Sequence, residues 1–150
     1  MFSSLKRVFI LLAGIVVVAF ASAAGTQISA DKPVINFRLP SFTPEGYRAY
    51  LVRGSEGFYV PKNNQIIIKE LTLTVFSGKE DDKVTTLILS PTATVLPAES
   101  VVTGDSTIRV INDDFEATGI GWRYAHKDKK TVIQKKVRVT FHAEIKNFLK

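Results

Sequence analysis

Short runs of alternating apolar and polar residues, separated by polar turns, recur along most of the chain. In residues 65–76 (QIIIKELTLTVF), three consecutive isoleucines are followed by strict alternation at Leu71, Leu73 and Val75. Residues 136–142 (KVRVTFH) alternate in the same way, again after a tyrosine and a polar turn. A period of two is typical of β-strands that bury one face. The pattern therefore predicts a β-rich protein built from similar hairpins.

The predicted strands are short and regularly spaced. They cover residues 34–39, 46–53, 56–60, 65–76, 83–89, 93–96, 107–111, 115–118, 131–135 and 136–142. The run over 65–76 is expected to be two strands or one bent strand. Pro91 and Pro97 are expected to interrupt strands. Gly119 and Gly121 are expected to mark a bend or a bulge. Strands of this length with frequent turns indicate one all-β domain over about residues 34–143, an antiparallel jellyroll or sandwich.

The two ends of the chain differ from this domain. Lys6 and Arg7 precede the uncharged run 8–20, and Ala-Ser-Ala follows, which is typical of a secretory signal cleaved after Ala23. The alternative is an uncleaved membrane anchor over residues 8–24, close to the lower limit of about 17 residues for a spanning helix. Both alternatives place the domain in the periplasm, free or anchored to the inner membrane.

Two short segments flank the domain. Residues 24–33 are expected to be a polar linker. In the tail 144–150, Ile145, Phe148 and Leu149 recur at helical spacing, which suits one or two amphipathic turns. Whether this tail covers the C-terminal edge of the domain is left open by the sequence.

The chain has no cysteine, which excludes disulfides, cysteine nucleophiles and thiolate metal sites. Its net charge is +6, with the excess near the C-terminus. The cations there are Lys127, Lys129, Lys130, Lys135, Lys136 and Arg138. Because the leader indicates export, nucleic acid is not expected as a partner, whereas an anionic membrane or a phosphorylated glycolipid is compatible with this charge. A solvated face that only maintains solubility explains it equally.

No catalytic or metal-binding motif is found. His126 and His142 are the only histidines, both expected to be exposed, and neither lies near further ligands in the sequence. The acidic residues of 80–82 and 113–114 fall in predicted turns, where Asp is favoured for local hydrogen bonds to the backbone. There is no glycine-rich phosphate loop and no nucleophile elbow. We therefore expect a protein that is not an enzyme and has no cofactor and no metal site.

Some predicted strands are apolar on both faces, for example 65–76 and 85–90 (TTLILS). Strands with one wet face do not have this pattern. Either these strands are central and covered, or part of the apolar surface lines a groove.

The segments FRLPSFTPEGYRAYLVRGSEGFYV (37–60), the alternating run that ends in VFSG (78), and SPTATVLPAESVVTGDSTIRVINDDFEATGIGWRY (90–124) with KKVRVTF (135–141) resemble the LptC family. This family is the periplasmic component of lipopolysaccharide export, and its fold is an OstA-like β-jellyroll. The resemblance implies an open hydrophobic groove for lipid acyl chains, with the sugar and phosphate head outside. The implied groove residues are Leu71, Leu73, Val75, Trp122, Tyr124, Val137, Val139 and Phe141.

The resemblance also implies docking by edge strands. A first strand near 34–39 would meet an inner-membrane export transporter, and the last strand would meet the next jellyroll of a periplasmic bridge. The implied docking residues are Val34, Phe37, Leu39, Arg138, Thr140 and His142. The rival hypothesis is an envelope β-sandwich, structural or carbohydrate-binding, with a filled core and with Trp122 and Tyr124 as exposed sugar platforms.

Overall fold

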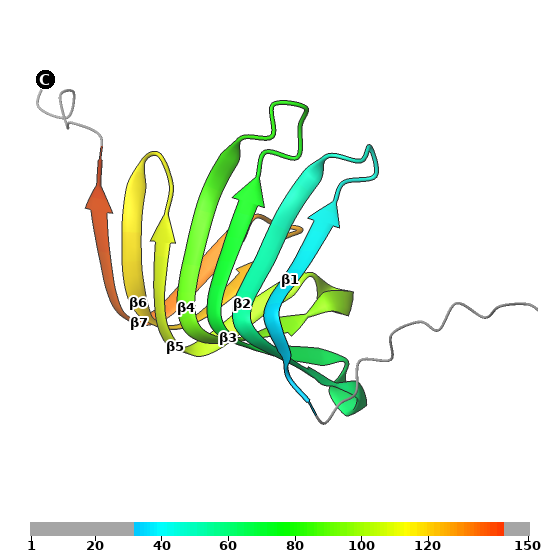
Figure 1. Cartoon of the computed structure of the whole chain (residues 1–150). Coiled ribbons are helices and arrows are strands. Elements are labelled where there is room, and N and C mark those ends of the chain that lie inside the picture. The colour runs from blue at the N-terminus through cyan, green and yellow to red at the C-terminus, as the bar shows by residue number, and fades with distance from the viewer. Residues whose placement is uncertain (1–31, 143–150) are drawn as a thin grey trace, which may run out of the picture.

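The computed structural model describes residues 32–142, which form a single antiparallel sheet of seven strands in the order of the chain. Figure 1 shows the strands side by side from β1 to β7. Their bounds are β1 Val34–Phe42, β2 Arg48–Val60, β3 Gln65–Phe76, β4 Val84–Leu96, β5 Val101–Ile111, β6 Phe115–Ala125 and β7 Lys130–Phe141. Two 3-10 turns, η1 Pro61–Asn63 and η2 Pro97–Glu99, connect β2 to β3 and β4 to β5. The predicted all-β class is confirmed.

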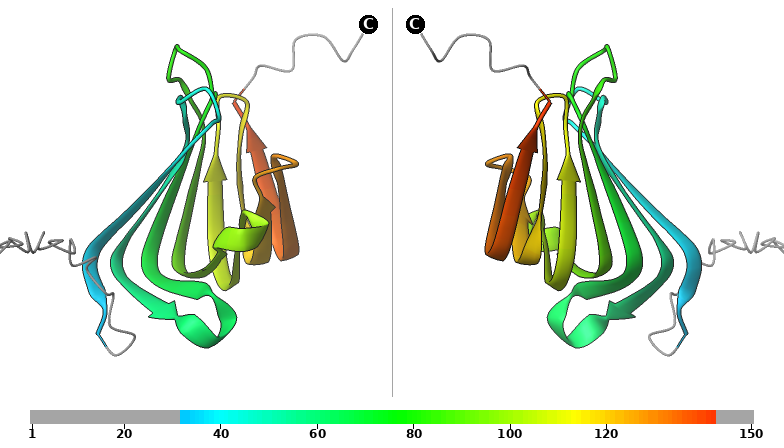
Figure 2. Two further views of the ribbon diagram at one scale, coloured as in Figure 1. Left: turned by 90° about the vertical axis from the view of Figure 1, so that its right-hand side faces the viewer. Right: turned by 90° about the vertical axis from the view of Figure 1, so that its left-hand side faces the viewer.

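Each strand bends near its middle, so the sheet folds into two layers that enclose one core (Figures 1 and 2). The regular pairing is interrupted along a line across the sheet. The unpaired positions include Asn36 in β1, Glu70 in β3, Pro91 in β4 and Lys136 in β7. Interruptions of this kind bend a strand and increase its twist. The single sheet therefore builds a sandwich without a crossover connection.

The bend in β3 explains why its sequence is apolar on both faces. Glu70 has a positive φ of 52°, which shifts the alternation by one residue. Ile68 before it and Leu71 and Leu73 after it all lie in the core, with at most 2% of each residue exposed. Ile67, on the opposite face, is 42% exposed. The two-faced pattern therefore comes from a change of phase, so the covered-strand interpretation applies to this segment.

At two positions the sequence predicted the end of a strand, whereas the structure has a bend within a continuous strand. β2 continues through residues 54–55 and β4 through Pro91, so each is one strand rather than two. Proline lacks an N–H donor, and in β4 it occupies a position with no partner in the ladder. The predicted bend at Gly119 and Gly121 is confirmed, and Gly121 has a φ of 69°.

A buried hydrogen-bond network holds the bend at the centre of the sheet. The Oγ of Ser90, a residue only 5% exposed, lies 2.7 Å from the carbonyl oxygen of Thr107 and accepts a bond of 3.2 Å from Nε1 of Trp122. A Cβ on Gly104 would lie 2.7 Å from that same Nε1, so Gly104 leaves room for the indole. β4, β5 and β6 thus pack closely here with the polar atoms satisfied.

The core is apolar and spans both layers. Its buried residues are Val52, Ile68, Leu71, Leu73, Val75, Ile88, Ala93, Val95, Val102, Ile108, Val110, Ala117, Trp122 and Tyr124. Strands β2 to β6 contribute to it. The edge strands β1 and β7 supply only partly buried residues, Phe37, Leu39 and Ile133. The sheet is therefore well packed in the centre and more open at its two edges.

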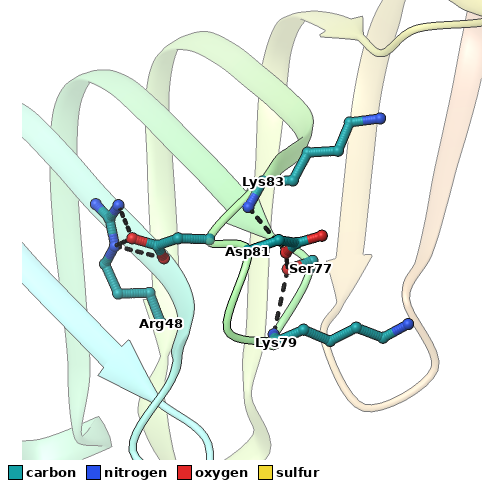
Figure 3. A network of polar contacts seen from close by, with 6 residues as sticks. Arg48, Ser77, Lys79, Asp81 and Lys83 are labelled. Atoms are coloured by element: carbon teal, nitrogen blue, oxygen red, sulfur yellow. Dashed lines mark hydrogen bonds and ion pairs between the residues drawn. The ribbon is translucent and has the colours of Figure 1, made fainter.

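The β3–β4 loop is fixed to its neighbours by polar contacts. Asp81 accepts hydrogen bonds from the Ser77 hydroxyl and from the backbone N–H of Lys83 (Figure 3). These two bonds lower the pKa of Asp81. Arg48 pairs with Asp82 and lies 4.1 Å from the centre of the Phe76 ring. The prediction of local hydrogen bonding by turn aspartates is thus confirmed at Asp81.

The β5–β6 turn uses a different residue from the one that the sequence suggested. Asn112, rather than Asp113 or Asp114, caps this turn, with its side-chain oxygen accepting from the N–H groups of Asp114 and Phe115. Asp113 instead pairs with Lys83 at 2.9 Å, which links the turn to the β3–β4 loop.

The predicted leader or anchor, most of the linker and the amphipathic tail lie outside the described residues. Within residues 32–142, no helix is long and apolar enough to cross a membrane.

Candidate functional site

A hollow of about 330 Å³ opens between the two layers beside β7. One side is formed by Val137 and Val139, which follow the bend of β7, and the other by Thr131 and Ile133, which precede it. The neighbouring strands add Thr86, Val110, Asn112, Phe115 and Ala117, and Lys129 lies at the lining as well. β7 therefore contributes to both sides of the same opening.

The apolar residues after the bend of β7 are unusually exposed. The exposed fractions of Val137, Val139 and Phe141 are 52%, 44% and 65%. They share one face because residues of a strand point alternately to its two sides. Phe141 packs edge to face on Phe115 of β6, with ring centres 6.3 Å apart. We call Val137, Val139 and Phe141 the apolar strip. Val137 and Val139 line the hollow, and Phe141 continues the strip toward the end of β7.

The other five predicted groove residues lie in the core. Leu71, Leu73, Val75, Trp122 and Tyr124 are each at most 4% exposed. Their side chains belong to the core between the layers, and Leu71 also lies at the lining of a wide depression along the bend. Their predicted contact with lipid stays a prediction. The structure thus brings two of the eight predicted groove residues, Val137 and Val139, to the open hollow, with Phe141 next to them on the same face, and it places the other five in the core.

The burial of Trp122 and Tyr124 contradicts the rival sugar-binding hypothesis. Sugar platforms require exposed aromatic faces, whereas Trp122 is 1% and Tyr124 4% exposed. Both residues follow Gly121, whose positive φ shifts the phase of β6 and turns their side chains into the core. In a strand without this bulge, strict alternation would place Trp122 and Tyr124 on the face opposite to the buried Ala117, outside the core.

The predicted docking residues lie on the two edge strands, β1 and β7. In β1, Val34 is 38% exposed, whereas Phe37 and Leu39 are half-buried against the core. In β7, Arg138 pairs with Thr118 and Thr140 with Glu116 in the register with β6. The N–H of His142 donates to the carbonyl oxygen of Asp114 at 2.9 Å. Within residues 32–142, each edge strand has one neighbour in the sheet and no strand on its other side.

The β7 edge is basic. Lys130, Lys135, Lys136 and Arg138 lie on this strand, which has no acidic residue. Within residues 32–142, none of these four cations forms an ion pair. Lysines on an edge strand oppose unspecific pairing with other chains. Of the basic residues near this edge, Lys129 lies at the lining of the hollow, whereas Lys136 lies at the lining of a separate depression along the bend.

Sequence reasoning missed the residues that line the hollow from β5, β6 and the first half of β7. Val110, Phe115, Thr131 and Ile133 belong to it, whereas the predicted groove residues lie within 71–75, 122–124 and 137–141. The strand register offers a signal for two lining residues of β6, because Phe115 pairs with Phe141 and Ala117 pairs with Val139. The contribution of Thr131 and Ile133 depends on the fold of β7 onto itself, which the sequence pattern does not reveal.

His126 was expected to be exposed, and this expectation is wrong. Its Nδ1 lies 2.9 Å from the Tyr124 hydroxyl, and its ring packs edge to face on Tyr50 with centres 4.7 Å apart. In Figure 1 the β6–β7 turn passes behind β2 and β3, which brings His126 of one layer to Tyr50 of the other. Burial, followed by the charge of Lys129, lowers the pKa of His126. Burial, followed by Tyr50, raises the pKa of Tyr124 to about 12.

A larger depression, of about 850 Å³, runs along the bend and is lined by residues such as Glu70, Pro91, Arg109 and Ile120. It is wide and shallow, and none of the strongly exposed apolar residues lies in it. We therefore place the candidate site at the smaller hollow. Within the described part of the chain, no group of three potential ligands is close enough to hold a metal ion.

The strands that form this site match a known family. The model of the family described as "Lipopolysaccharide-assembly, LptC-related" matches residues 77–142. Residues 77–142 are therefore similar to the LptC-related family. The match contains β4 to β7, and hence the apolar strip and the basic edge, and it confirms the resemblance that the sequence suggested over residues 77–142. No curated protein matches the chain. The LptC-related family indicates a role in lipopolysaccharide transport and a location in the cell envelope.

Proposed function

We propose that the protein is a non-enzymatic component of lipopolysaccharide transport in the periplasm, where the hollow beside β7 shelters part of a lipid acyl chain. The observation that carries this proposal is the apolar strip at the mouth of the hollow, inside the region that matches the LptC-related family. Each CH₂ group removed from water contributes about 0.8 kcal/mol, so apolar surface alone lowers the cost of moving a lipid. No catalytic group is required for this role.

The size of the hollow limits what it holds. Its volume of about 330 Å³ is at the lower end of the range of small-molecule sites, about 300–1,000 Å³. It therefore takes a section of one chain, while the remaining chains lie along the apolar strip or in a neighbouring protein. Leu71, Leu73, Val75, Trp122 and Tyr124 would be reached only if the two layers separate.

The proposal also includes docking by the two edge strands and contact between the basic residues of β7 and the lipid phosphates. β7 joins the next jellyroll of a periplasmic bridge by strand addition, through residues such as Arg138, Thr140 and His142. β1 joins the inner-membrane transporter in the same way, near Val34, Phe37 and Leu39. Lys135, Lys136 and Arg138 face the phosphates of the glycolipid, which remain in water while the acyl chain is sheltered.

Photocrosslinking tests the lipid path with a matched pair of positions. Val139 and Thr140 are adjacent in β7 but point to opposite faces, since Val139 pairs with the buried Ala117 and Thr140 with Glu116. A photoreactive residue is introduced at each position in cells, and the products are blotted for lipopolysaccharide. We expect a glycolipid ladder from position 139 that requires energised export, and little or none from position 140.

Two outcomes of this experiment would count against the proposed lipid path. Equal crosslinking at positions 139 and 140 would indicate unspecific contact with lipid. Its absence at 139, together with absence at Leu73 and Phe141, would leave these residues as ordinary structural positions and would contradict the proposed lipid path.

A further inference from the structure

Two arginines face each other at the edge of the sheet opposite to β7. Arg38 of β1 and Arg53 of β2 are directly paired in the strand register, so their side chains share one face, and both residues are exposed. The arginines Arg48, Arg109 and Arg123 each have a carboxylate partner. Within residues 32–142, neither Arg38 nor Arg53 forms an ion pair. Like charges directly opposite each other destabilise a sheet, so this pair lowers the stability of the edge without an acidic partner to offset it.

The two arginines line a depression of about 650 Å³ at the bends of β1, β2 and β3, which lie side by side in Figure 1. Asn36 and Glu70, two of the residues with positive φ at these bends, lie at its lining. Most side chains of the lining are polar, and one half-buried aromatic ring joins them. They are Asn36, Arg38, Arg53, Ser55, Glu70 and Thr72, with Phe37 as the aromatic residue. The depression therefore suits a polar ligand rather than an acyl chain.

The charge of the two guanidinium groups matches that of a phosphate monoester. Arginine stays protonated, and its N–H donors form a planar fork that binds two phosphate oxygens at once. A phosphate monoester carries a charge of about −1.5 to −2 at pH 7 and three acceptor oxygens. It therefore neutralises both Arg38 and Arg53, whereas a carboxylate carries a single negative charge.

The rest of the depression has room and partners for more than a phosphate. Its volume lies within the range of small-molecule sites, about 300–1,000 Å³. The hydroxyl of Ser55 donates to the carbonyl oxygen of Lys69 at 3.4 Å, so its oxygen remains an acceptor. The carboxylate of Glu70 repels a broad anionic surface but accepts hydrogen bonds from neutral hydroxyl groups. Together with Thr72, these groups suit the hydroxyls of a sugar ring.

We propose that this depression binds a sugar phosphate, with the phosphate between Arg38 and Arg53 and the sugar hydroxyls toward Glu70 and Thr72. The site is separate from the hollow beside β7 and does not depend on the shelter of an acyl chain. It gives the molecule a contact for a phosphorylated glycan at the edge opposite to the cations of β7.

An exchange of arginine for lysine separates a built site from a merely positive face. Arg38→Lys/Arg53→Lys keeps the charge but loses the planar forks. Amide chemical shifts of the full-length chain are followed by NMR during titration with glucose 6-phosphate. We expect the shifts to be confined to residues 36–38, 53–55 and 70–72, and the affinity of the lysine variant to be about tenfold weaker. Lys62→Gln/Arg123→Gln removes two exposed charges elsewhere and is expected to change the affinity less than about twofold.

Equal affinities of the unchanged protein and the lysine variant would reduce the pair to a charged surface and would overturn the site. Inorganic phosphate that binds as tightly as glucose 6-phosphate would overturn the sugar contacts, and glucuronate that binds as tightly would overturn the recognition of phosphate. Vesicles of phosphatidic acid present a phosphate monoester without a sugar. If the lysine variant loses more binding to these vesicles than to glucose 6-phosphate, the arginines serve a lipid headgroup and the proposal fails.

The melting temperature supplies a second measurement. Because Arg38 and Arg53 repel each other, Arg38→Gln is expected to raise the melting temperature without ligand. The same variant is expected to abolish the rise that glucose 6-phosphate produces in the unchanged protein. A lower melting temperature without ligand would contradict the repulsion on which the proposal is based, and an unchanged ligand-dependent rise would contradict binding at Arg38. None of these sugar-phosphate titrations involves an acyl chain, so failure here is distinct from failure of the proposed lipid path.

Discussion

At the scale of single residues, Glu70 determines which face of β3 enters the core. Its φ of 52° lies in the left-handed region, where β-branched residues are strongly disfavoured. Its side chain is exposed, so a substitution changes the backbone preference with little change in burial. We expect Glu70→Val to lower the free energy of unfolding by about 1–2 kcal/mol, measured by denaturant titration with the fluorescence of the single tryptophan, Trp122.

Thr72→Val is the matched control for this prediction. Thr72 lies two residues further along β3, paired with Arg53 and Leu89, and its φ is not positive. Valine suits an ordinary strand position, so we expect a change within about 0.5 kcal/mol. A similar loss of stability in both variants would contradict the role of φ at Glu70.

His126 makes stability depend on pH because it connects the two layers. Its folded-state pKa is below the ordinary value of 6.5, so the neutral ring is favoured in the folded protein. The unfolded chain therefore binds more protons as the pH falls through 6.5, and the stability that His126 contributes is lost below that pH. The groups around the ring are Tyr50, Tyr124 and Lys129, and no carboxylate is among them.

The measurement is the melting temperature between pH 8 and pH 5.5 for the unchanged protein and for His126→Gln. We expect the melting temperature of the unchanged protein to fall with acidification and that of the variant to change less. Asp81, Asp82 and Glu116 have lowered pKa values, so the stability they add is lost only at more acidic pH. Parallel curves for the two proteins would show that His126 is not the group responsible.

At the scale of the elements, the sequence predicted the class of the fold and most of the turns, because alternation and turn residues are local signals. It did not predict seven continuous strands. Each bend depends on one or two residues that change the phase, such as Glu70 or Gly121, and their effect appears only when neighbouring strands bend along the same line. Pro91 was taken as a strand end because its tolerance in β4 depends on that common bend.

The candidate site was predictable to the extent that it lies on one strand. Val137, Val139 and Phe141 alternate in the sequence, and the structure places the first two at the hollow and Phe141 next to them against Phe115. Trp122 and Tyr124 carried no comparable signal, because the shift at Gly121 decides which face they occupy. Ile133 enters the hollow only through the folding of β7, a long-range feature that no local pattern encodes.

The free edge of β7 can be tested by a pair of adjacent prolines. N–H groups of neighbouring residues in an antiparallel edge strand point alternately to the sheet and to solvent. Of Arg138→Pro and Val139→Pro, one variant therefore loses a bond to β6 and the other loses only an outward donor. We expect the first to lose about 1–3 kcal/mol of stability and the second to stay nearly as stable but no longer bind an added strand.

A labelled peptide of residues 34–42 is the probe for this binding, since it represents the N-terminal edge of a like jellyroll. Val139→Ala reports the effect of losing the valine side chain alone. If the variant that keeps its stability also binds the peptide as well as the unchanged protein does, strand addition at β7 is contradicted.

At the scale of the whole molecule, charge is distributed unevenly between the two edges and the loops. Acidic residues of the loops are partly neutralised, with Asp82 paired to Arg48 and Asp113 to Lys83. The cations of β7 have no such partners within residues 32–142. An anionic lipid surface is therefore expected to meet the molecule at β7, where the hollow opens.

The position of the cations, rather than the net charge, is the testable feature. The triple variant Lys135→Gln/Lys136→Gln/Arg138→Gln is compared with Arg38→Gln/Arg53→Gln/Lys62→Gln, which removes the same charge from exposed residues of β1, β2 and the β2–β3 turn. A basic residue near an anionic surface contributes about 1 kcal/mol, so the β7 variant is expected to bind phosphatidylglycerol vesicles about 100-fold more weakly at low salt. The control is expected to lose far less, and added salt to reduce the difference. Equal losses in both variants would show that net charge alone attracts the protein to lipid, and would remove the argument that β7 faces the glycolipid phosphates.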